Sequence, residues 1–281
     1  DLNTKEEDVV TQMLTTSTHS DLLFFTDAGK VYQCKMFEIP EGRRATKGKS
    51  IMNFLSMSSD ENVTSVLPVR KGAWDEGDWS LLMVTKNGVI KKSDASAFKD
   101  VRRSGLIAIN LRPEDKLKGA LFVAEGDEVS LVTYNGQAIR FKEADVRQMG
   151  RTAAGVAAMK LKGDDYIVAA DVLKKGEEDR EILVVMENGF GKTTPAKEYK
   201  TQNRGGSGIK TAKVTAKTGK VVGAAALAPG DRREGELVVM SKKGQVIKLA
   251  LKDVPTLGRD TQGVKVMKMK AGDSIATIVY F

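Results

Sequence analysis

Short apolar runs separated by turn-forming glycines recur along the whole chain. The clearest unit is 181–214, with an apolar run at 182–186, the turn Glu187-Asn188-Gly189, a polar arm, a glycine-rich turn ending at Gly208, and an alternating run at 209–214. Asn-Gly between apolar runs predicts a β-hairpin, and a type I′ turn would need positive φ at both Asn188 and Gly189.

The same unit occurs five times. A turn glycine is followed 17 or 19 residues later by a second glycine, and the period between turn glycines is 48 to 59 residues. Self-similarity at this period is typical of a propeller or a repeat array. The turn glycines are Gly29, Gly88, Gly136, Gly189 and Gly244, and the second glycines are Gly48, Gly105, Gly155, Gly208 and Gly263.

The pattern predicts an all-β chain. First strands are expected at 9–16, 63–69, 117–123, 167–173, 221–227 and 274–281, hairpins at 22–35, 129–142 and around Gly88, Gly189 and Gly244, and closing strands at 51–55, 106–111, 156–161, 209–214 and 264–269. The alanine-rich runs 153–159 and 223–227 are too short for helices. Six first strands with five hairpins predict five complete repeats and a partial sixth, completed by residues that would precede Asp1.

Each repeat holds about four strands, a sheet too small to bury both faces alone, and radial packing of such sheets gives a β-propeller. No linker richer in Gly, Pro or Ser separates two repeats, so we expect one domain over 1–281. A row of separate small β domains is the alternative.

Net charge, cysteine content and the lengths of the apolar runs limit the classes of function that the chain can have. The net charge of +8 favours a polyanionic partner such as nucleic acid or an anionic membrane. The single cysteine, Cys34, excludes an internal disulfide and is expected to be buried in a strand. No apolar run is long enough to span a membrane, and the first residues do not resemble a signal peptide, so we expect a cytoplasmic protein.

Catalytic and metal-binding patterns are weak. His19 is the only histidine, so a histidine metal cluster or a Ser-His-Asp triad would depend on it alone, and we expect it to lie in a solvated loop. The glycine-rich turn that ends at Gly208 lacks the Lys-Ser/Thr of a P-loop. We therefore predict a non-catalytic domain without a metal or cofactor.

Basic residues recur instead. Arg44, Arg151, Arg204 and Arg259 each stand four residues before a second glycine, and the second repeat has Val101 there, followed by Arg102 and Arg103. A second series follows the turn glycine by three or four residues: Lys91, Lys92, Arg140, Lys192 and Lys248, with Gln33 in the first repeat. Cations at equal steps match the phosphates of a curved duplex, and sparse aromatics argue against single-strand stacking.

These residues carry a family resemblance. The chain resembles the C-terminal, DNA-wrapping domain of the A subunit of bacterial DNA gyrase, a propeller that also occurs in topoisomerase IV. The likeness spans nearly all 281 residues and is close at 37–55, 135–155, 187–193 and 258–264. The family's gyrase box, Gln-Arg-Arg-Gly-Gly-Lys-Gly, is expected upstream of Asp1; the alternative is a parent that lacks the box and behaves more like topoisomerase IV. Residues 202–208 (QNRGGSG) resemble the box four repeats later.

The resemblance implies that the chain binds, bends and wraps duplex DNA and supports ATP-dependent negative supercoiling, with ATP and Mg²⁺ used elsewhere in the parent enzyme. Its partners would be DNA, the other A-subunit domains and the B subunit, in the cytoplasm at the nucleoid. The alternatives are a topoisomerase IV domain for decatenation or relaxation, and a protein–protein scaffold. The predicted DNA-binding residues are Arg43, Arg44, Lys47, Lys49, Lys91, Lys92, Arg102, Arg103, Arg140, Arg147, Arg151, Lys192, Arg204, Gly205, Gly206, Lys210, Lys248, Arg259 and Lys265.

Overall fold

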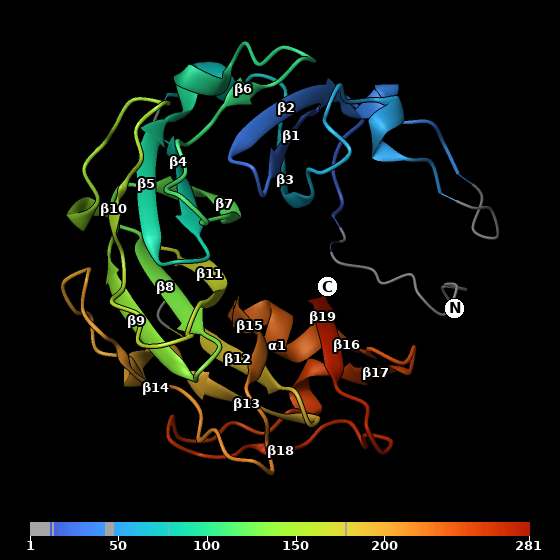
Figure 1. Cartoon of the computed structure of the whole chain (residues 1–281), viewed down its shortest axis with the longest axis vertical. Coiled ribbons are helices and arrows are strands. Elements are labelled where there is room, and N and C mark those ends of the chain that lie inside the picture. The colour runs from blue at the N-terminus through green and yellow to red at the C-terminus, as the bar shows by residue number, and fades with distance from the viewer. Residues whose placement is uncertain (1–11, 13, 43–47, 78, 178) are drawn as a thin grey trace. The chain divides into compact units, whose positions relative to one another are not determined.

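The computed structural model describes residues 12, 14–42, 48–77, 79–177 and 179–281. Its regular structure is almost entirely antiparallel β-sheet (Figure 1). The strands are β1 (Asp21–Thr26), β2 (Lys30–Lys35), β3 (Val63–Val69), β4 (Trp79–Thr85), β5 (Val89–Asp94), β6 (Leu106–Ile107), β7 (Leu117–Ala124), β8 (Glu128–Thr133), β9 (Gln137–Lys142), β10 (Val156–Ala157), β11 (Ile167–Leu173), β12 (Glu181–Met186), β13 (Phe190–Pro195), β14 (Ile209–Lys210), β15 (Val221–Leu227), β16 (Glu236–Ser241), β17 (Val246–Ala250), β18 (Val264–Lys265) and β19 (Ile275–Tyr280).

Helical structure within the described residues is short. One α-helix, α1 (Pro229–Glu234), follows β15, and 3-10 helices cover Met36–Glu38, Ile51–Asn53, Ala73–Asp75, Ala95–Phe98, Glu143–Asp145, Ala196–Glu198 and Leu251–Asp253. The two alanine-rich runs are not helical, as expected, but the sequence did not predict α1. Residues 51–53 form a 3-10 helix where a closing strand was expected, and most of the predicted strand 9–16 lies outside the described residues.

The sheets exchange strands between successive repeats. The orders β3-β1-β2-β6, β10-β5-β4-β7, β11-β8-β9-β14 and β15-β12-β13-β18 each place a hairpin at the centre and two later strands beside it. The strand that opens one repeat therefore pairs with the hairpin of the repeat before it. The fifth sheet has the order β17-β16-β19.

This exchange corrects one prediction. The expected start of a partial sixth repeat, 274–281, forms β19, which pairs with β16 from Leu237↔Tyr280 to Ser241↔Ile275. β19 thus belongs to the fifth sheet, in the place that β15 takes beside β12. The described residues contain five sheets, of which four have four strands, and the all-β fold class is confirmed.

The hairpin turns also differ in type from the prediction. The amide of Gly189 donates to the carbonyl oxygen of Met186 (3.0 Å), and φ is +81° at Gly189. Asn188 is not among the described residues with positive φ, so the loop is a type I turn followed by a left-handed glycine and not the predicted type I′ turn. Gly29, Gly88, Gly136 and Gly244 repeat the same hydrogen bond to the residue three positions earlier.

The closing strands are shorter than predicted, two residues instead of about six. β6, β10, β14 and β18 each pair with the second strand of the hairpin one repeat earlier, not with the hairpin directly before them in the chain, and then stop. The strand ends there because two successive amides donate to one glycine carbonyl, which interrupts the regular ladder. The Gly189 carbonyl accepts hydrogen bonds from the amides of Val266 (2.9 Å) and Met267 (3.1 Å). Gly29 and Gly136 each accept two amides in the same way.

The described chain divides into two compact units. The first contains Leu14–Glu125 and Val146–Ala157, and the second contains Gly126–Asp145 and Ala158–Phe281. In the first unit, Leu23 and Phe25 of β1 pack in one apolar cluster with Leu81 and Met83 of β4. Burying each such side chain contributes roughly 1.5–3 kcal/mol, so side chains from neighbouring sheets hold the unit together.

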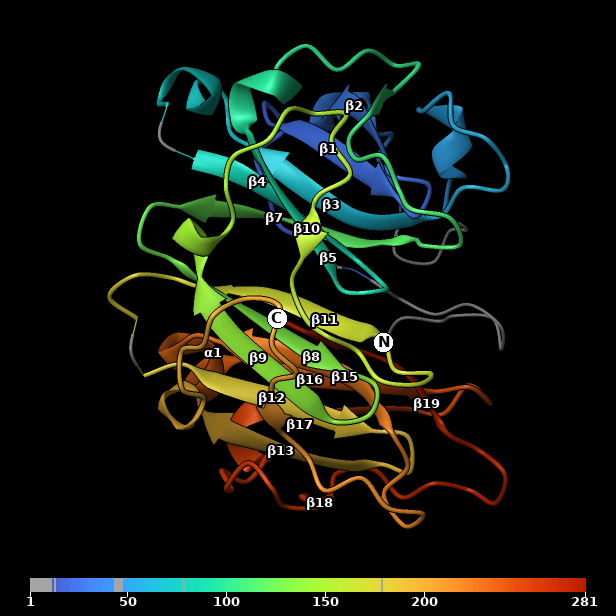
Figure 2. The same cartoon turned by 60° about the vertical axis from the view of Figure 1, so that its left-hand side comes forward.

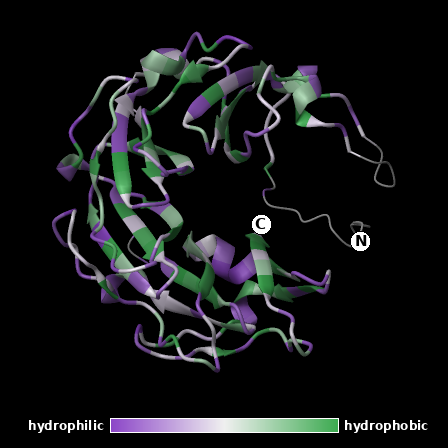
Figure 3. Ribbon diagram, in the orientation of Figure 1, coloured by the Kyte–Doolittle hydropathy of each residue, from purple (hydrophilic) through white to green (hydrophobic). Residues whose placement is uncertain are grey.

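In the second unit, Leu183 and Val185 of β12 share a cluster with Leu237 and Val239 of β16. In Figure 3 the green, hydrophobic residues lie mostly in the strands, whereas purple, hydrophilic residues are frequent in the loops and in α1. Both units thus bury the strand faces that the apolar runs provide. The prediction of a single domain over 1–281 stays a prediction.

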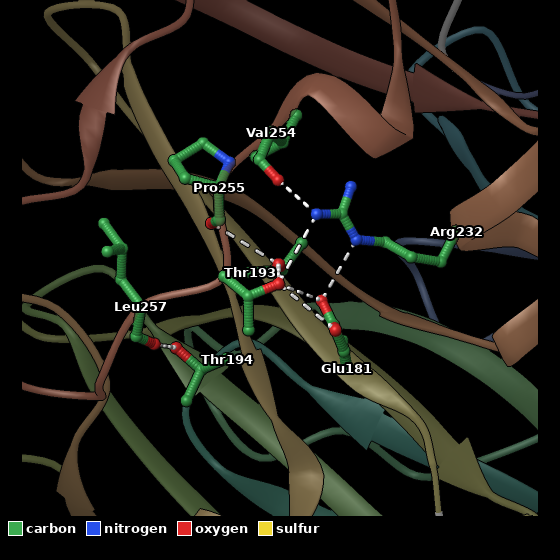
Figure 4. Close-up of polar contacts among 8 residues, drawn as sticks. Glu181, Thr193, Thr194, Arg232, Val254, Pro255 and Leu257 are labelled. Atoms are coloured by element: carbon green, nitrogen blue, oxygen red, sulfur yellow. Dashed lines mark hydrogen bonds and ion pairs between the residues drawn. The ribbon is translucent and has the colours of Figure 1, made fainter.

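A polar network attaches α1 to its neighbours in the second unit (Figure 4). The guanidinium of Arg232 lies 3.2 Å from the carboxylate of Glu181 on β12 and donates a further hydrogen bond to the Val254 carbonyl. Thr194 of β13 donates to the Leu257 carbonyl at 2.7 Å. These bonds hold 254–257, the segment that leads into the fourth arginine-containing turn, against β12 and β13. Figure 2 shows β12 and β13, which form an antiparallel pair, side by side in the second unit.

Candidate nucleic-acid interface

The arginine-containing loops dock on hairpins. We call residues 101–105, 151–155, 204–208 and 259–263 the basic turns; each ends in a glycine with φ between +71° and +85°. That glycine lies against the hairpin one repeat earlier: a Cβ on Gly155 would lie 2.6 Å from the Ile90 carbonyl oxygen in β5, and one on Gly263 would lie 2.6 Å from the Gly191 carbonyl oxygen in β13. The second glycine is therefore required both by its φ and by close backbone approach.

The basic turn at 151–155 belongs to the first unit. Arg151 is half-buried, and its carbonyl oxygen accepts a hydrogen bond from the ammonium of Lys91. The sequence predicted that Lys91 contacts a phosphate. Its side chain is fully buried, so it cannot make that contact. Burial, together with the charge of Arg151, lowers the pKa of Lys91 to about 8. Lys91 is buried because β5 is covered on both faces and has no solvated side at this position.

The turn at 259–263 repeats this arrangement in the second unit. The ammonium of the fully buried Lys192 donates to the carbonyls of Gly258 (2.6 Å) and Arg259. Burial lowers the pKa of Lys192 to about 8. Lys192 is thus withdrawn from the predicted contact set for the same reason as Lys91. Arg259 is half-buried and donates to the Lys210 carbonyl at 2.9 Å.

The turn at 204–208 is built differently. Arg204 is half-buried and its Nε donates to the carbonyl oxygen of Asp145 at 2.8 Å. The amide of Gly205 donates to the Ala158 carbonyl at 2.6 Å. A Cβ on Gly206 would find its nearest atoms at 3.6 Å, so the close approach in this turn belongs to Gly208.

The second predicted series divides into two positions of the hairpin. Three residues after the turn glycine stand the buried Lys91 and Lys192, and four residues after it stand Lys92, Arg140 and Lys248. Adjacent strand residues point to opposite faces, so these cations do not form one row.

Arg140 and Lys248 are also paired with carboxylates. Arg140 forms an ion pair with Glu128 and is only 22% exposed, while Lys248 pairs with Glu236 and is 55% exposed. Lys92 is half-buried. Arg140 would have to break a largely buried ion pair to bind a phosphate, and Lys248 a more exposed one.

Most of the other predicted residues are exposed. Arg103 pairs with Glu38, Lys210 lies 3.5 Å from Asp260, and the ammonium of Lys265 lies 5.7 Å from the ring centre of Phe190. The exposed set is Lys49, Arg102, Arg103, Arg147, Lys210 and Lys265. Arg43, Arg44 and Lys47 lie outside the described residues.

Sequence reasoning missed a group of lysines near β14. The ammonium of Lys217 lies 5.5 Å from the centre of the Phe190 ring, and that of Lys220 lies 5.7 Å from the Tyr134 ring. Lys217 and Lys265 therefore share one aromatic ring. The signal was the run of four lysines at 210, 213, 217 and 220, spaced three or four residues apart.

Other site chemistry is sparse in the described part of the chain. His19 is exposed, and no group of three or more His, Cys, Asp or Glu side chains there could hold a metal ion. No described helix is both long and apolar enough to cross a membrane. The basic turns are the feature that recurs in both units.

Comparison with known proteins agrees with this geometry. The family model described as "DNA gyrase C-terminal domain, beta-propeller" matches residues 20–70, 80–124, 127–174, 180–228 and 235–280. The DNA gyrase A subunit of Staphylococcus epidermidis is 39% identical over 277 residues, 99% of this chain and 30% of the relative. That of Deinococcus deserti is 42% identical over 274 residues, 96% of this chain and 33% of the relative. The chain thus spans about a third of these relatives.

Two solved structures are similar to the whole chain. The crystal structure of the C-terminal domain of DNA topoisomerase IV has a TM-score of 0.85 and 26% identity, covering 100% of this chain and 84% of that one. The DNA gyrase A C-terminal domain has a TM-score of 0.77 and 27% identity, covering 95% and 84%. The five matched segments each contain one hairpin and the long strand that completes its sheet: β3, β7, β11, β15 or β19.

Proposed function

Because the chain belongs to the DNA gyrase C-terminal domain family, whose fold is the β-propeller, we propose that it binds, bends and wraps duplex DNA. It does so as the C-terminal domain of a type IIA topoisomerase A subunit. The wrapped duplex supports ATP-dependent negative supercoiling by the complete enzyme, in the cytoplasm at the nucleoid.

One observation carries this proposal: the basic turns repeat in a fixed relation to the hairpins. In both units an arginine precedes a left-handed glycine that lies on the second hairpin strand, at the edge of a sheet. Equivalent cations at equivalent edges suit a ligand with evenly spaced negative charges. The phosphate backbone of duplex DNA is such a ligand, and contacts to it fix position without reading sequence.

The chemistry of strand passage belongs elsewhere in the parent enzyme. We assign no catalytic residue, metal or cofactor to this domain, and the parent would use ATP and Mg²⁺ in other domains. Its protein partners would be the B subunit and the other domains of its own subunit. The alternative is a topoisomerase IV type of domain, which the similarity to the topoisomerase IV structure favours.

Salt-dependent binding tests the proposal. A random-sequence duplex labelled for fluorescence transfer reports both affinity and bending. We expect binding that hardly depends on sequence and that falls on the order of 10³–10⁵-fold between 50 and 200 mM salt if six to ten phosphates are contacted. The main variant replaces Arg151, Arg204 and Arg259 with alanine and should lower the slope by roughly one contact per arginine.

A charge-matched control separates the basic turns from net charge. Replacing Arg70, Arg112 and Arg233 with alanine removes the same three charges from exposed positions outside the basic turns. We expect this control to bend DNA like the wild type, apart from a small general loss of affinity. Equal losses in the two triple variants, or a flat salt response of the wild type, would refute binding through the basic turns.

A further inference from the structure

Lys91 and Lys192 occupy the same position in two sheets, three residues after the turn glycine, and both side chains are fully buried. The Lys91 ammonium donates to three carbonyl oxygens, those of Ala108, Gly150 (3.2 Å) and Arg151. Three donors meet three acceptors, so its hydrogen-bonding capacity is filled entirely by the backbone.

Lys192 is bonded in nearly the same way. Its ammonium donates to the carbonyls of Gly258 and Arg259 and to the hydroxyl of Thr261 at 3.1 Å. In both sheets the acceptors include the carbonyl of the arginine and that of the glycine before it. Each lysine therefore binds the first two peptide groups of a basic turn from inside the protein.

The orientation of these peptide groups follows from the carbonyls. No described peptide bond is cis, and in a trans peptide the N–H points opposite to the C=O. The N–H groups of Arg151 and Thr152 consequently point away from the Lys91 ammonium. Those of Arg259 and Asp260 point away from the Lys192 ammonium, and the Arg259 N–H donates a hydrogen bond to a carboxylate oxygen of Glu198 at 3.3 Å, an anionic oxygen that a phosphate would have to replace. Outward N–H groups beside an arginine are a common way to bind a phosphate.

The charge of each lysine adds to this effect. The charge of Arg151 acts electrostatically on Lys91. The charges of Glu198, Asp260 and Arg259 act in the same way on Lys192. The Lys91 cation is thus held by carbonyl dipoles, one of which is the carbonyl of Arg151 itself. A buried cation at this place raises the positive potential at the turn, where screening by water is weak.

We propose that Lys91 and Lys192 are positioning residues that shape the turns at 151–155 and 259–263 into backbone-phosphate sites. The inference rests on the proposed DNA binding and extends it to two side chains that never touch DNA. Each lysine acts through the peptide groups of its turn.

The turn at 204–208 provides a natural comparison. The residue three positions after its turn glycine is Ile139, which is buried and reaches to 3.6 Å from the Cβ position of Gly206. An isoleucine is therefore compatible with this site in the fold. In the two lysine-bearing sheets the residue before the arginine is Gly150 or Gly258, and in this one it is Asn203.

The test replaces both lysines in the full chain. Lys91→Ile/Lys192→Ile copies the residue found at 139, and Lys91→Met/Lys192→Met keeps the length of the side chain without its charge. With a 40-base-pair duplex at about 0.1 M salt, loss of two contacts should weaken binding roughly 25- to 100-fold and lower the salt slope by about two. Melting temperatures measured alongside should show that both variants fold.

A pH profile distinguishes positioning from general support of the fold. Affinity of the wild type should fall as pH rises from 7 to 9, because the two ammonium groups lose their protons in this range. The double variants should show no such decline. In the opposite direction, Ile139→Lys should strengthen DNA binding at pH 7 and make it more dependent on pH.

The outcomes are distinct. Folded double variants with wild-type affinity, salt slope and pH profile would overturn the inference while leaving DNA binding by the wild type intact. A wild type that does not bind the duplex would overturn the proposed function itself. Reduced affinity without a change in pH profile would mean that the lysines serve folding alone, and the positioning role would be rejected.

Discussion

The carboxylate of Glu181 on β12 forms an ion pair with Arg232 on α1 at 3.2 Å, and each side chain is about one-fifth exposed. Thr256 donates a hydrogen bond to the same carboxylate at 3.2 Å. A helix of six residues is too short to be stable alone. The position of α1 therefore depends on this contact with a strand of the neighbouring sheet.

Arg232→Ala should destabilise the chain by about 1–3 kcal/mol, because it leaves the Glu181 carboxylate without its cation. Glu181→Gln should cost less, since the amide still accepts a hydrogen bond. Urea unfolding of both variants and of the double variant measures the coupling between the two side chains. A coupling energy near zero would show that other contacts hold α1 in place.

Gly189→Ala tests the turn geometry. Alanine at φ +81° is strained, and its Cβ would overlap the Met267 carbonyl oxygen. We expect a loss of about 2–4 kcal/mol in the free energy of unfolding. Gly230→Ala in α1 is the matched control: its Cβ meets nothing within 4 Å, and alanine should stabilise the helix by about 0.5–1 kcal/mol. Similar effects of the two substitutions would contradict the turn assignment.

The buried lysines also predict how stability depends on pH. Their pKa is lowered to about 8 in the folded chain from an ordinary value of 10.5. Between these values the unfolded chain binds more protons, so the free energy of unfolding rises with pH. The clean window is pH 8 to 9, because the pKa of Cys34, raised from 9.0 to about 11 by burial, acts in the opposite direction above 9.

Urea unfolding at pH 8 and 9 measures this effect. The wild type should gain roughly 1 kcal/mol per lysine over that unit. Lys91→Ile/Lys192→Ile should show a smaller change or none. A wild type that loses stability over this range would show that the two lysines are not buried in solution.

Cys34 should react slowly with thiol reagents. Its side chain is 4% exposed, and burial raises the pKa of the thiol to about 11, so very little thiolate is present at neutral pH. We expect one equivalent of thiol to react with an aromatic disulfide reagent only after denaturation. Fast reaction of the folded chain at pH 7 would place Cys34 at the surface.

The sequence predicted the hairpins well because their signals are local. An apolar run, a turn glycine and a second apolar run lie within about 15 residues, and β1–β2 and β8–β9 formed as expected. No local signal in the sequence predicts that β3 pairs with β1, because the apolar residues of β3 would be buried equally well beside the hairpin before it or the hairpin after it. Strand exchange and the position of β19 therefore required the structure.

The exposed cations of the proposed DNA-binding site were harder to predict from the sequence than the hairpins were. Lysine in a strand is usually solvated, but β5 and β13 are covered on both faces, so alternation does not show where Lys91 and Lys192 point. Their role depends on carbonyls 59 to 67 positions further along the chain. The arginines were found because their spacing to a glycine repeats.

Strand exchange sets the order in which the chain becomes complete during synthesis. Val31 pairs with Leu106 and Ile90 with Val156, so a hairpin waits for an edge strand that lies 66 to 75 positions later. At 5–20 residues per second this takes about 3–15 s. Throughout that time the waiting hairpin offers an unpaired edge to any other nascent chain nearby. Ribosomes crowded on one message would therefore favour mispairing between copies at the hairpins whose edge strands have not yet been made.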